Sequence, residues 1–298
     1  MKGKDIAGVM HNCAVMTSVS KYTRENIRVF TSSLKRTGFS GRKLAVVFTA
    51  DNNTIRHLED EGFEIYAPES ERRAWGLEYV RREGMAKENV FSDRFLRYAE
   101  LCKGIERDSN VLACDCRDIA FQKDPGVALQ KLLERSNKSI ICSLEGARIM
   151  DEDWSRENMK ENFPEIYEYV KEREIANAGV IGGKASSVED LFLTIYLVSL
   201  AGRKHARPIL TSTDQSAYNI IIRQDVWEQK TLFADNGSEW TCQIGTYLAL
   251  SGSDNWNQTN NPQVTDGIFY NDKGEEYSLV HQYDRVGAWR EALEKRYQ

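Results

Sequence analysis

The stretch Asn110-Val-Leu-Ala-Cys-Asp-Cys-Arg-Asp118 decides the fold prediction, because a short apolar run there ends in two acidic residues. The run from Asn110 to Cys114 predicts a buried β-strand. Ligands of an open α/β sheet bind beyond the carboxyl ends of its strands, so residues directly after a buried strand face a site. Asp115 and Asp118 occupy that position.

The chain before this stretch alternates β-rich runs with helical patterns. This alternation is typical of a mostly parallel central sheet flanked by helices, so the predicted fold class is α/β. A polar turn is expected at 18–23, directly after the first strand. The strands are predicted at 13–17, 44–49 and 63–66, with helices between them.

The chain after this stretch continues the pattern. Ser187 and Asp190 have the spacing of a capping box, which predicts that an apolar helix begins there and ends at Gly202. We expect one domain over residues 1–298, with a nucleotide-binding half (1–122) and an acceptor-binding half (123–298). The other predicted elements are strands at 139–143 and 178–181, a helix from 213, loops and small strands over 235–273, and a helix at 287–297.

The composition excludes some classes of partner. The net charge is -5, and Lys and Arg are scattered among acidic residues, so nucleic acid is not an expected partner. The six cysteines lack paired spacing, which favours buried reduced thiols. We see no apolar run near the ~20 residues of a membrane span and no signal-peptide pattern, so a cytoplasmic protein is expected.

The two acids suggest a metal site. Closely spaced carboxylates suit Mg²⁺ or Mn²⁺, and such an ion can bridge the oxygens of a diphosphate. Arg117, between the acids, could add positive charge or pair with one of them. The alternative is that Asp115 and Asp118 only cap a turn, since Asp is common at strand ends.

The residues that follow carry a family resemblance. Ile119-Ala-Phe-Gln122 and Asp124-Pro125 come directly after the acids, and the whole segment resembles the "DxD" region of GT-A glycosyltransferases. These enzymes belong to the nucleotide-diphospho-sugar transferase superfamily. The segment is similar to the D-x-R-D variant of the motif, and glycogenin-like enzymes are among its relatives. The usual second acid lies two positions after the first, where this chain has Arg117.

Four further segments agree with this resemblance in order and spacing. They are the helix Phe91 to Tyr98, the segment Asn177 to Gly183, the helix start Thr213 to Asn219, and Val280 to Tyr283. The resemblance implies a fold, a metal site and a donor site. The implied metal ligands are Asp115, Asp118 and His281, and the implied donor-binding residues are Arg94, Asn177, Gly179 and Gln215.

Two residues are candidates for catalysis, Asp214 and Arg117. Asp214 would be the general base if the enzyme inverts anomeric configuration, and it would orient the donor sugar if configuration is retained. No glycine-rich phosphate loop follows the first strand, so the metal, Arg94 and Arg117 are expected to neutralise the diphosphate. Thr17, Ser18 and Tyr22, at the end of that strand, are expected to meet the nucleotide.

The sequence therefore predicts a metal-dependent glycosyltransferase that uses Mn²⁺ or Mg²⁺. Its donor would be a UDP- or GDP-sugar, and its acceptor a hydroxyl, most simply on a glycan. Two alternatives stay open. One is a sugar-phosphate nucleotidyltransferase, and the other is a non-catalytic carbohydrate-binding or scaffold protein on a degenerate transferase fold.

Overall fold

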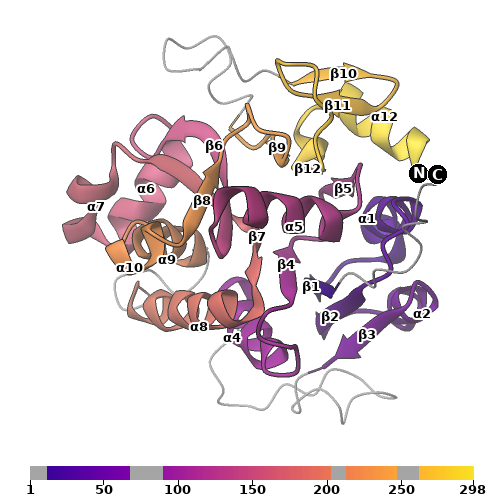
Figure 1. Ribbon diagram of the computed structural model, residues 1–298, viewed down its shortest axis with the longest axis horizontal. Coiled ribbons are helices and arrows are strands. Elements are labelled where there is room, and N and C mark those ends of the chain that lie inside the picture. Colours follow the sequence, from indigo (N-terminus) through magenta and orange to yellow (C-terminus); the bar gives the residue numbers. More distant parts are fainter. Residues whose placement is uncertain (1–11, 68–89, 203–212, 247–261) are drawn as a thin grey trace, which may run out of the picture.

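A seven-stranded sheet forms the centre of the computed structural model, which describes residues 12–67, 90–202, 213–246 and 262–298 (Figure 1). The strand order is β3-β2-β1-β4-β7-β6-β8. Within the described residues, β7 is antiparallel to both neighbours, and the other pairs are parallel. The strands are β1 (Cys13–Ser20), β2 (Arg42–Thr49), β3 (Phe63–Tyr66), β4 (Asn110–Cys114), β6 (Ile140–Arg148), β7 (Glu174–Lys184) and β8 (Thr231–Ala234).

Helices cover both faces of this sheet. On one face, Phe95, Phe192 and Tyr218 belong to the same core cluster as Met16 of β1. They come from α4 (Val90–Cys102), α8 (Ala185–Gly202) and α9 (Thr213–Ile221). The neighbouring residue of β1, Val15, belongs to a second cluster with apolar residues of three more helices, because side chains alternate along a strand. These helices are α1 (Arg24–Arg36), α2 (Asn52–Asp60) and α5 (Pro125–Ser136).

A smaller sheet lies beside the central one, in the order β5-β12-β9 (Figure 1). The side-chain amide of Gln122, just after β5, donates to the carbonyls of Phe269 and Tyr277 and accepts from the Phe269 N–H. It thereby attaches the C-terminal region to β5. The elements here are β5 (Ile119–Phe121), β9 (Thr241–Gln243), β10 (Gln263–Thr265), β11 (Ile268–Tyr270), β12 (Leu279–His281), a 3₁₀ turn (Tyr283–Arg285) and α12 (Gly287–Arg296).

Most predicted elements are present, and the segment between β6 and β7 folds into helices. These are α6 (Asp153–Asn162) and α7 (Pro164–Val170), and the short α10 (Asp225–Glu228) precedes β8. The central sheet continues across residue 122, and the division into nucleotide and acceptor halves stays a prediction. The six cysteines are buried and free, as expected.

Several predicted boundaries are wrong: β6 extends to Arg148 where the prediction ended at 143, and β7 spans Glu174–Lys184 where the prediction covered 178–181. Two other boundaries differ for physical reasons. The helix α8 begins at Ala185, before the predicted cap at Ser187. The reason is that its first two N–H groups donate to backbone carbonyls that precede β4, Ala185 to Ser109 and Ser186 to Arg107. Tertiary acceptors therefore replace the cap. The predicted turn at 18–23 is shorter than expected, because β1 continues to Ser20, which pairs with the last residue of β2.

One helix departs from the sequence expectation about membranes. Among the described residues, α8 alone is long and apolar enough to cross a bilayer by length and composition. Leu191, Phe192 and Ile195 of this helix belong to the main core, and α8 packs against α4 and α9. Core helices of this kind pass the same test, so it is weak support for a membrane span.

We predict that Gly183→Ala destabilises the fold. Gly183 lies in β7 between Val111 and Ile140. A Cβ there would stand 2.5 Å from the Ser139 carbonyl oxygen and 2.8 Å from Val188. The backbone of paired strands can shift little to make room for this Cβ. We therefore expect the free energy of unfolding, measured by urea denaturation, to fall by about 1–3 kcal/mol.

The matched control is Gly104→Ala, where the nearest atom to a new Cβ would be at 3.5 Å, an ordinary contact. It should change the free energy of unfolding by no more than about 0.5 kcal/mol. Equal stability of the two variants would contradict the packing assigned to β7.

Candidate active site

The turn after β4 begins the site. The Asp115 N–H donates to the Gly179 carbonyl of β7 at 2.9 Å, which continues the β4–β7 pairing by one residue. Gly179 has no side chain, and a Cβ there would lie 2.6 Å from His281 Cε1 and 2.8 Å from Asp115 Oδ2. A glycine at this place in β7 therefore lets the imidazole and the carboxylate approach each other.

The smaller sheet brings the predicted third metal ligand to the same place. In that sheet His281 pairs with Ile119, the residue directly after Asp118. The His281 Nε2 atom lies 3.6 Å from Asp115 Oδ2 and 3.7 Å from Asp118 Oδ1. One ligand atom from each of the three residues lies within 4.8 Å of the others. The structure thus assembles all three predicted ligands.

This group fits a divalent cation on three counts. His281 Nε2 is buried without a hydrogen-bond partner among the described residues, and its distances to the carboxylates are too long for hydrogen bonds. Two carboxylates and an imidazole are a donor set that suits Mn²⁺. Among the described residues, the linked ion pairs around His281 also contain more carboxylates than guanidinium groups: four aspartates (115, 118, 214 and 284) and three arginines (94, 117 and 285).

A buried arginine lies beneath this group. Arg94 of α4 pairs with Asp115 Oδ1 and, at 3.0 Å, with Asp214 Oδ2. The side chain of Arg94 is 9% exposed and that of Asp214 is 3% exposed, whereas Asp115 is 33% exposed. Asp115 is thus the open end of a buried charge network. The predicted contact of Arg94 with a diphosphate stays a prediction, because both of its terminal nitrogens bind carboxylates here.

The charges shift the pKa values of the three candidate ligands in different directions. Burial alone would raise the pKa of Asp115, but Arg94 and His281 outweigh it and hold this pKa well below its usual range. Burial raises the pKa of Asp118, and the Asp115 charge adds to that rise. Burial alone would lower the pKa of His281, but the two carboxylates outweigh it and raise this pKa.

The predicted sugar-binding segment contacts a residue that the sequence analysis missed. Asn177 of β7 donates from its Nδ2 to Glu145 Oε1 at 2.6 Å, and its Oδ1 accepts from the Gly179 N–H at 2.7 Å. Glu145 belongs to β6 and is buried, and burial raises its pKa to about 7. An acid directly after the mostly apolar run Ile140 to Leu144 is the signal that could have identified it.

Residues at the start of α9 hydrogen-bond to the backbone of β7. Gln215 donates from its side-chain amide to the Ala176 carbonyl and accepts from the Ala178 N–H, both at 2.8 Å. Asn219 bonds both backbone groups of Ala176. These side-chain amides hydrogen-bond to backbone N–H and carbonyl groups of β7 in the part of the strand that does not pair with β4. Contact of Gln215 with a donor therefore stays a prediction. Asp214, with its pKa raised by burial against the opposing effect of Arg94, is enclosed beside them.

The remaining predicted residues lie around the acidic turn. Ser18 accepts from the Cys116 thiol through its carbonyl at 3.3 Å, and Thr17 precedes it in β1. Tyr22 follows β1 by two residues, and burial, as the main cause, raises the pKa of its phenol to about 12. Arg117 points to the rim of the site, where it pairs with Asp118 at 3.2 Å and with Asp284 at 3.1 Å.

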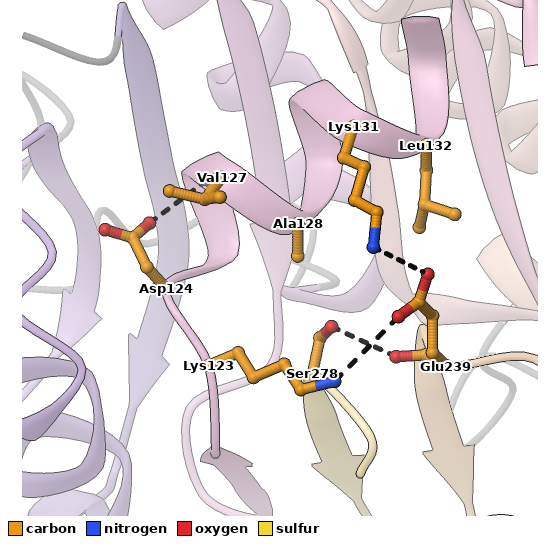
Figure 2. Close-up of a pocket in the computed structure, with 8 residues that line it drawn as sticks. All are labelled: Lys123, Asp124, Val127, Ala128, Lys131, Leu132, Glu239 and Ser278. Carbon is orange, nitrogen blue, oxygen red and sulfur yellow. Dashed lines mark hydrogen bonds and ion pairs between the residues drawn. The ribbon is translucent and has the colours of Figure 1, made fainter. Parts of the chain in front are cut away.

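A separate cavity of about 360 Å³ lies between α5 and the start of β12 (Figure 2). Glu239 is its central charge, and Figure 2 shows Lys123 and Lys131 directed to this carboxylate. None of the candidate metal ligands lines it. The cavity is therefore distinct from the candidate active site.

Comparisons with known proteins bear on the fold. No protein-family model matches the chain, and no curated protein sequence matches it. Among solved structures, that of the galactosyltransferase LgtC in complex with donor and acceptor sugar analogues is similar, with a TM-score of 0.52 and 10% identity. The match covers 95% of this chain and 95% of that chain. Taken with the strand order and the helices on both faces, it shows that this chain has the GT-A fold.

Proposed function

We propose that this protein is a metal-dependent glycosyltransferase that moves a sugar from a nucleotide diphosphate donor to an acceptor hydroxyl. The observation that carries the proposal is the meeting of Asp115, Asp118 and His281, three residues from the end of β4 and the end of β12. They lie beyond the carboxyl end of a buried strand, where ligands of α/β sheets bind. The likeness of the fold to that of a galactosyltransferase agrees with this proposal.

Asp115, Asp118 and His281 would hold a Mn²⁺ or Mg²⁺ ion. When bound, such an ion stabilises the negative charge that develops on a leaving diphosphate. A donor diphosphate would bring further negative charge to a group of side chains that is already rich in acids. Without a cation, these acids would repel the donor, so the proposal requires metal for donor binding.

The other side chains of the site fit the handling of a sugar. Thr17 and Ser18 in β1 and Tyr22 just after it stay our candidates for contact with the nucleoside, and of these Thr17 is fully buried and Ser18 nearly so. Asn177 and Glu145 offer a donor and an acceptor to hydroxyl groups on the side of β7. Asp214 keeps its place as the candidate base or sugar-orienting residue, with Arg94 holding its carboxylate. The choice of donor nucleotide, sugar and acceptor depends on contacts with other residues.

The position of Arg117 favours an enzyme over a degenerate scaffold. A basic residue at the usual place of the second acid would disable a metal site if it left no carboxylate oxygen for the cation. Here the Arg117 guanidinium pairs with Oδ2 of Asp118 and with Asp284, while Oδ1 of Asp118 faces His281 Nε2 at 3.7 Å and stays open to a cation. The acid displaced by one residue along the turn therefore compensates for the arginine.

We predict that nucleotide-sugar binding needs both metal and Asp115. A UDP- or GDP-sugar with Mn²⁺ should raise the melting temperature by several degrees, since a ligand at about 100 times its Kd adds about 2.7 kcal/mol of stability. The shift should vanish in EDTA and in Asp115→Asn, whose turnover should fall by about a hundredfold or more.

The matched control is Asp153→Asn, the same change on a carboxylate that is 89% exposed on α6. It should keep the shift and the turnover. A folded Asp115→Asn protein with the turnover of the wild type would refute the proposed role of the metal. No shift with either class of donor would favour the scaffold.

A second prediction concerns pH. Protonated His281 cannot bind a cation, and Asp115 and Asp118 raise its pKa despite burial, while burial raises that of Asp118. Metal must therefore displace protons, and its affinity should rise with pH through the ordinary histidine pKa of about 6.5 and above it, by up to about tenfold per pH unit for each proton displaced.

Titration of free Mn²⁺ by electron paramagnetic resonance at several pH values measures this dependence. The comparison is His281→Gln, in which an amide oxygen can still bind metal but no imidazole proton competes. Its affinity should depend less steeply on pH. The same slope in both proteins would show that His281 is not a ligand.

A further inference from the structure

Gln243 lies directly behind the imidazole of His281. The two residues pair across the parallel strands β9 and β12. The side-chain Oε1 of Gln243 lies 2.8 Å from Nδ1 of His281, and both residues are 1% exposed. This contact is on the side of the ring away from Asp115 and Asp118, which face Nε2.

Gln243 is itself held in place through its backbone. Its N–H donates to Asn236 Oδ1 at 2.8 Å, and its carbonyl accepts from Asn236 Nδ2 at 3.1 Å. The Asn236 carbonyl in turn accepts from the Tyr277 hydroxyl. All these residues are buried, so the amide behind His281 belongs to a fixed frame and not to a mobile surface.

The chemistry of this contact selects one form of the imidazole. A neutral histidine carries hydrogen on one ring nitrogen and a lone pair on the other. An oxygen acceptor facing Nδ1 requires the hydrogen to be there, which leaves the lone pair on Nε2. Nε2 has no hydrogen-bond partner in the described parts of the chain and lies 3.6 Å and 3.7 Å from the two carboxylates.

Packing alone does not account for glutamine at this position. The Nε2 of Gln243 is buried without a hydrogen-bond partner among the described residues, and such a group carries a cost in stability. An apolar side chain of similar size would avoid that cost. Among the residues that the structure describes, the one hydrogen bond from the side chain of Gln243 is the bond to His281, so its benefit must come through that ring.

We propose that Gln243 is a positioning residue for the cation site. It fixes the orientation and tautomer of His281 so that Nε2 is presented to a divalent cation together with Asp115 and Asp118. This inference rests on the proposed metal-dependent function, and it adds a residue outside the ligand set. Partners of metal-binding histidines typically contribute about 10- to 100-fold to metal affinity.

The test measures Mn²⁺ binding to the full-length protein by electron paramagnetic resonance, with no donor present. Gln243→Leu removes the acceptor at similar size and should weaken Mn²⁺ binding by at least about tenfold. Gln243→Glu keeps an oxygen acceptor for the Nδ1 hydrogen and should bind Mn²⁺ within about threefold of the wild type or more tightly. Gln263→Leu, the same change at an exposed position in β10, should have no effect.

The pattern of outcomes separates the two proposals. If the wild type binds no Mn²⁺, the metal-dependent function fails, and the role of Gln243 fails with it. If the wild type binds Mn²⁺ and Gln243→Leu binds equally well, only the role of Gln243 is overturned. Equal weakening in the Leu and Glu variants would also overturn it, because it would show sensitivity to packing and not to the acceptor.

A spectroscopic measurement covers the case in which Gln243→Leu does not fold. Wild-type protein labelled with ¹⁵N-histidine, free of metal and at alkaline pH, reports which ring nitrogen carries hydrogen. The His281 signals are identified by their loss in His281→Asn. Hydrogen on Nδ1 supports the proposal, and hydrogen on Nε2 overturns it.

Discussion

A single buried guanidinium joins three parts of the fold at the site. Arg94 comes from α4, and its two carboxylate partners come from the end of β4 and the start of α9. Arginine stays charged in a protein interior, so the aspartates on either side can stay ionised although Asp214 is almost fully enclosed. Loss of one member of such a group leaves a buried charge unpaired, which typically costs about 3–5 kcal/mol. The position of Asp115, and with it the opening of the site, depends on this arrangement.

Much of the fold follows from patterns in the sequence. The apolar runs of β1, β2 and β4 and the spacing of Ile27, Phe30 and Leu34 predict buried strands and an amphipathic helix, and the structure contains them. These patterns are local, and burial of one face determines them. The start of α8 was not predictable in this way, because its first amides bond to carbonyls distant in sequence, Ser109 and Arg107.

The residues of the candidate site also differ in whether a local sequence pattern identifies them. The acids after β4 could be identified because strand ends in α/β sheets face ligands. The place of Glu145 in a β-strand could have marked it as a candidate, but its partner Asn177 lies on another strand and could not be read from the sequence. Gln243 gives no such signal, because its contact with His281 is made across two strands. Gln215 differs from both: its pattern predicts ligand contact, which stays a prediction, and in the structure its amide bonds to the backbone of β7.

The absence of a side chain at Gly179 has a consequence for ion size. Two of the candidate ligands, His281 and Asp115, lie against the Cα atom of Gly179 in β7. From Val180 onward this strand pairs with β4. Strand backbone is stiffer than the rotamers of surface side chains, so the width of the gap is set by the sheet. The site would then favour an ion whose radius matches the fixed spacing between His281 and Asp115, because these side chains could move little to fit a larger or smaller ion.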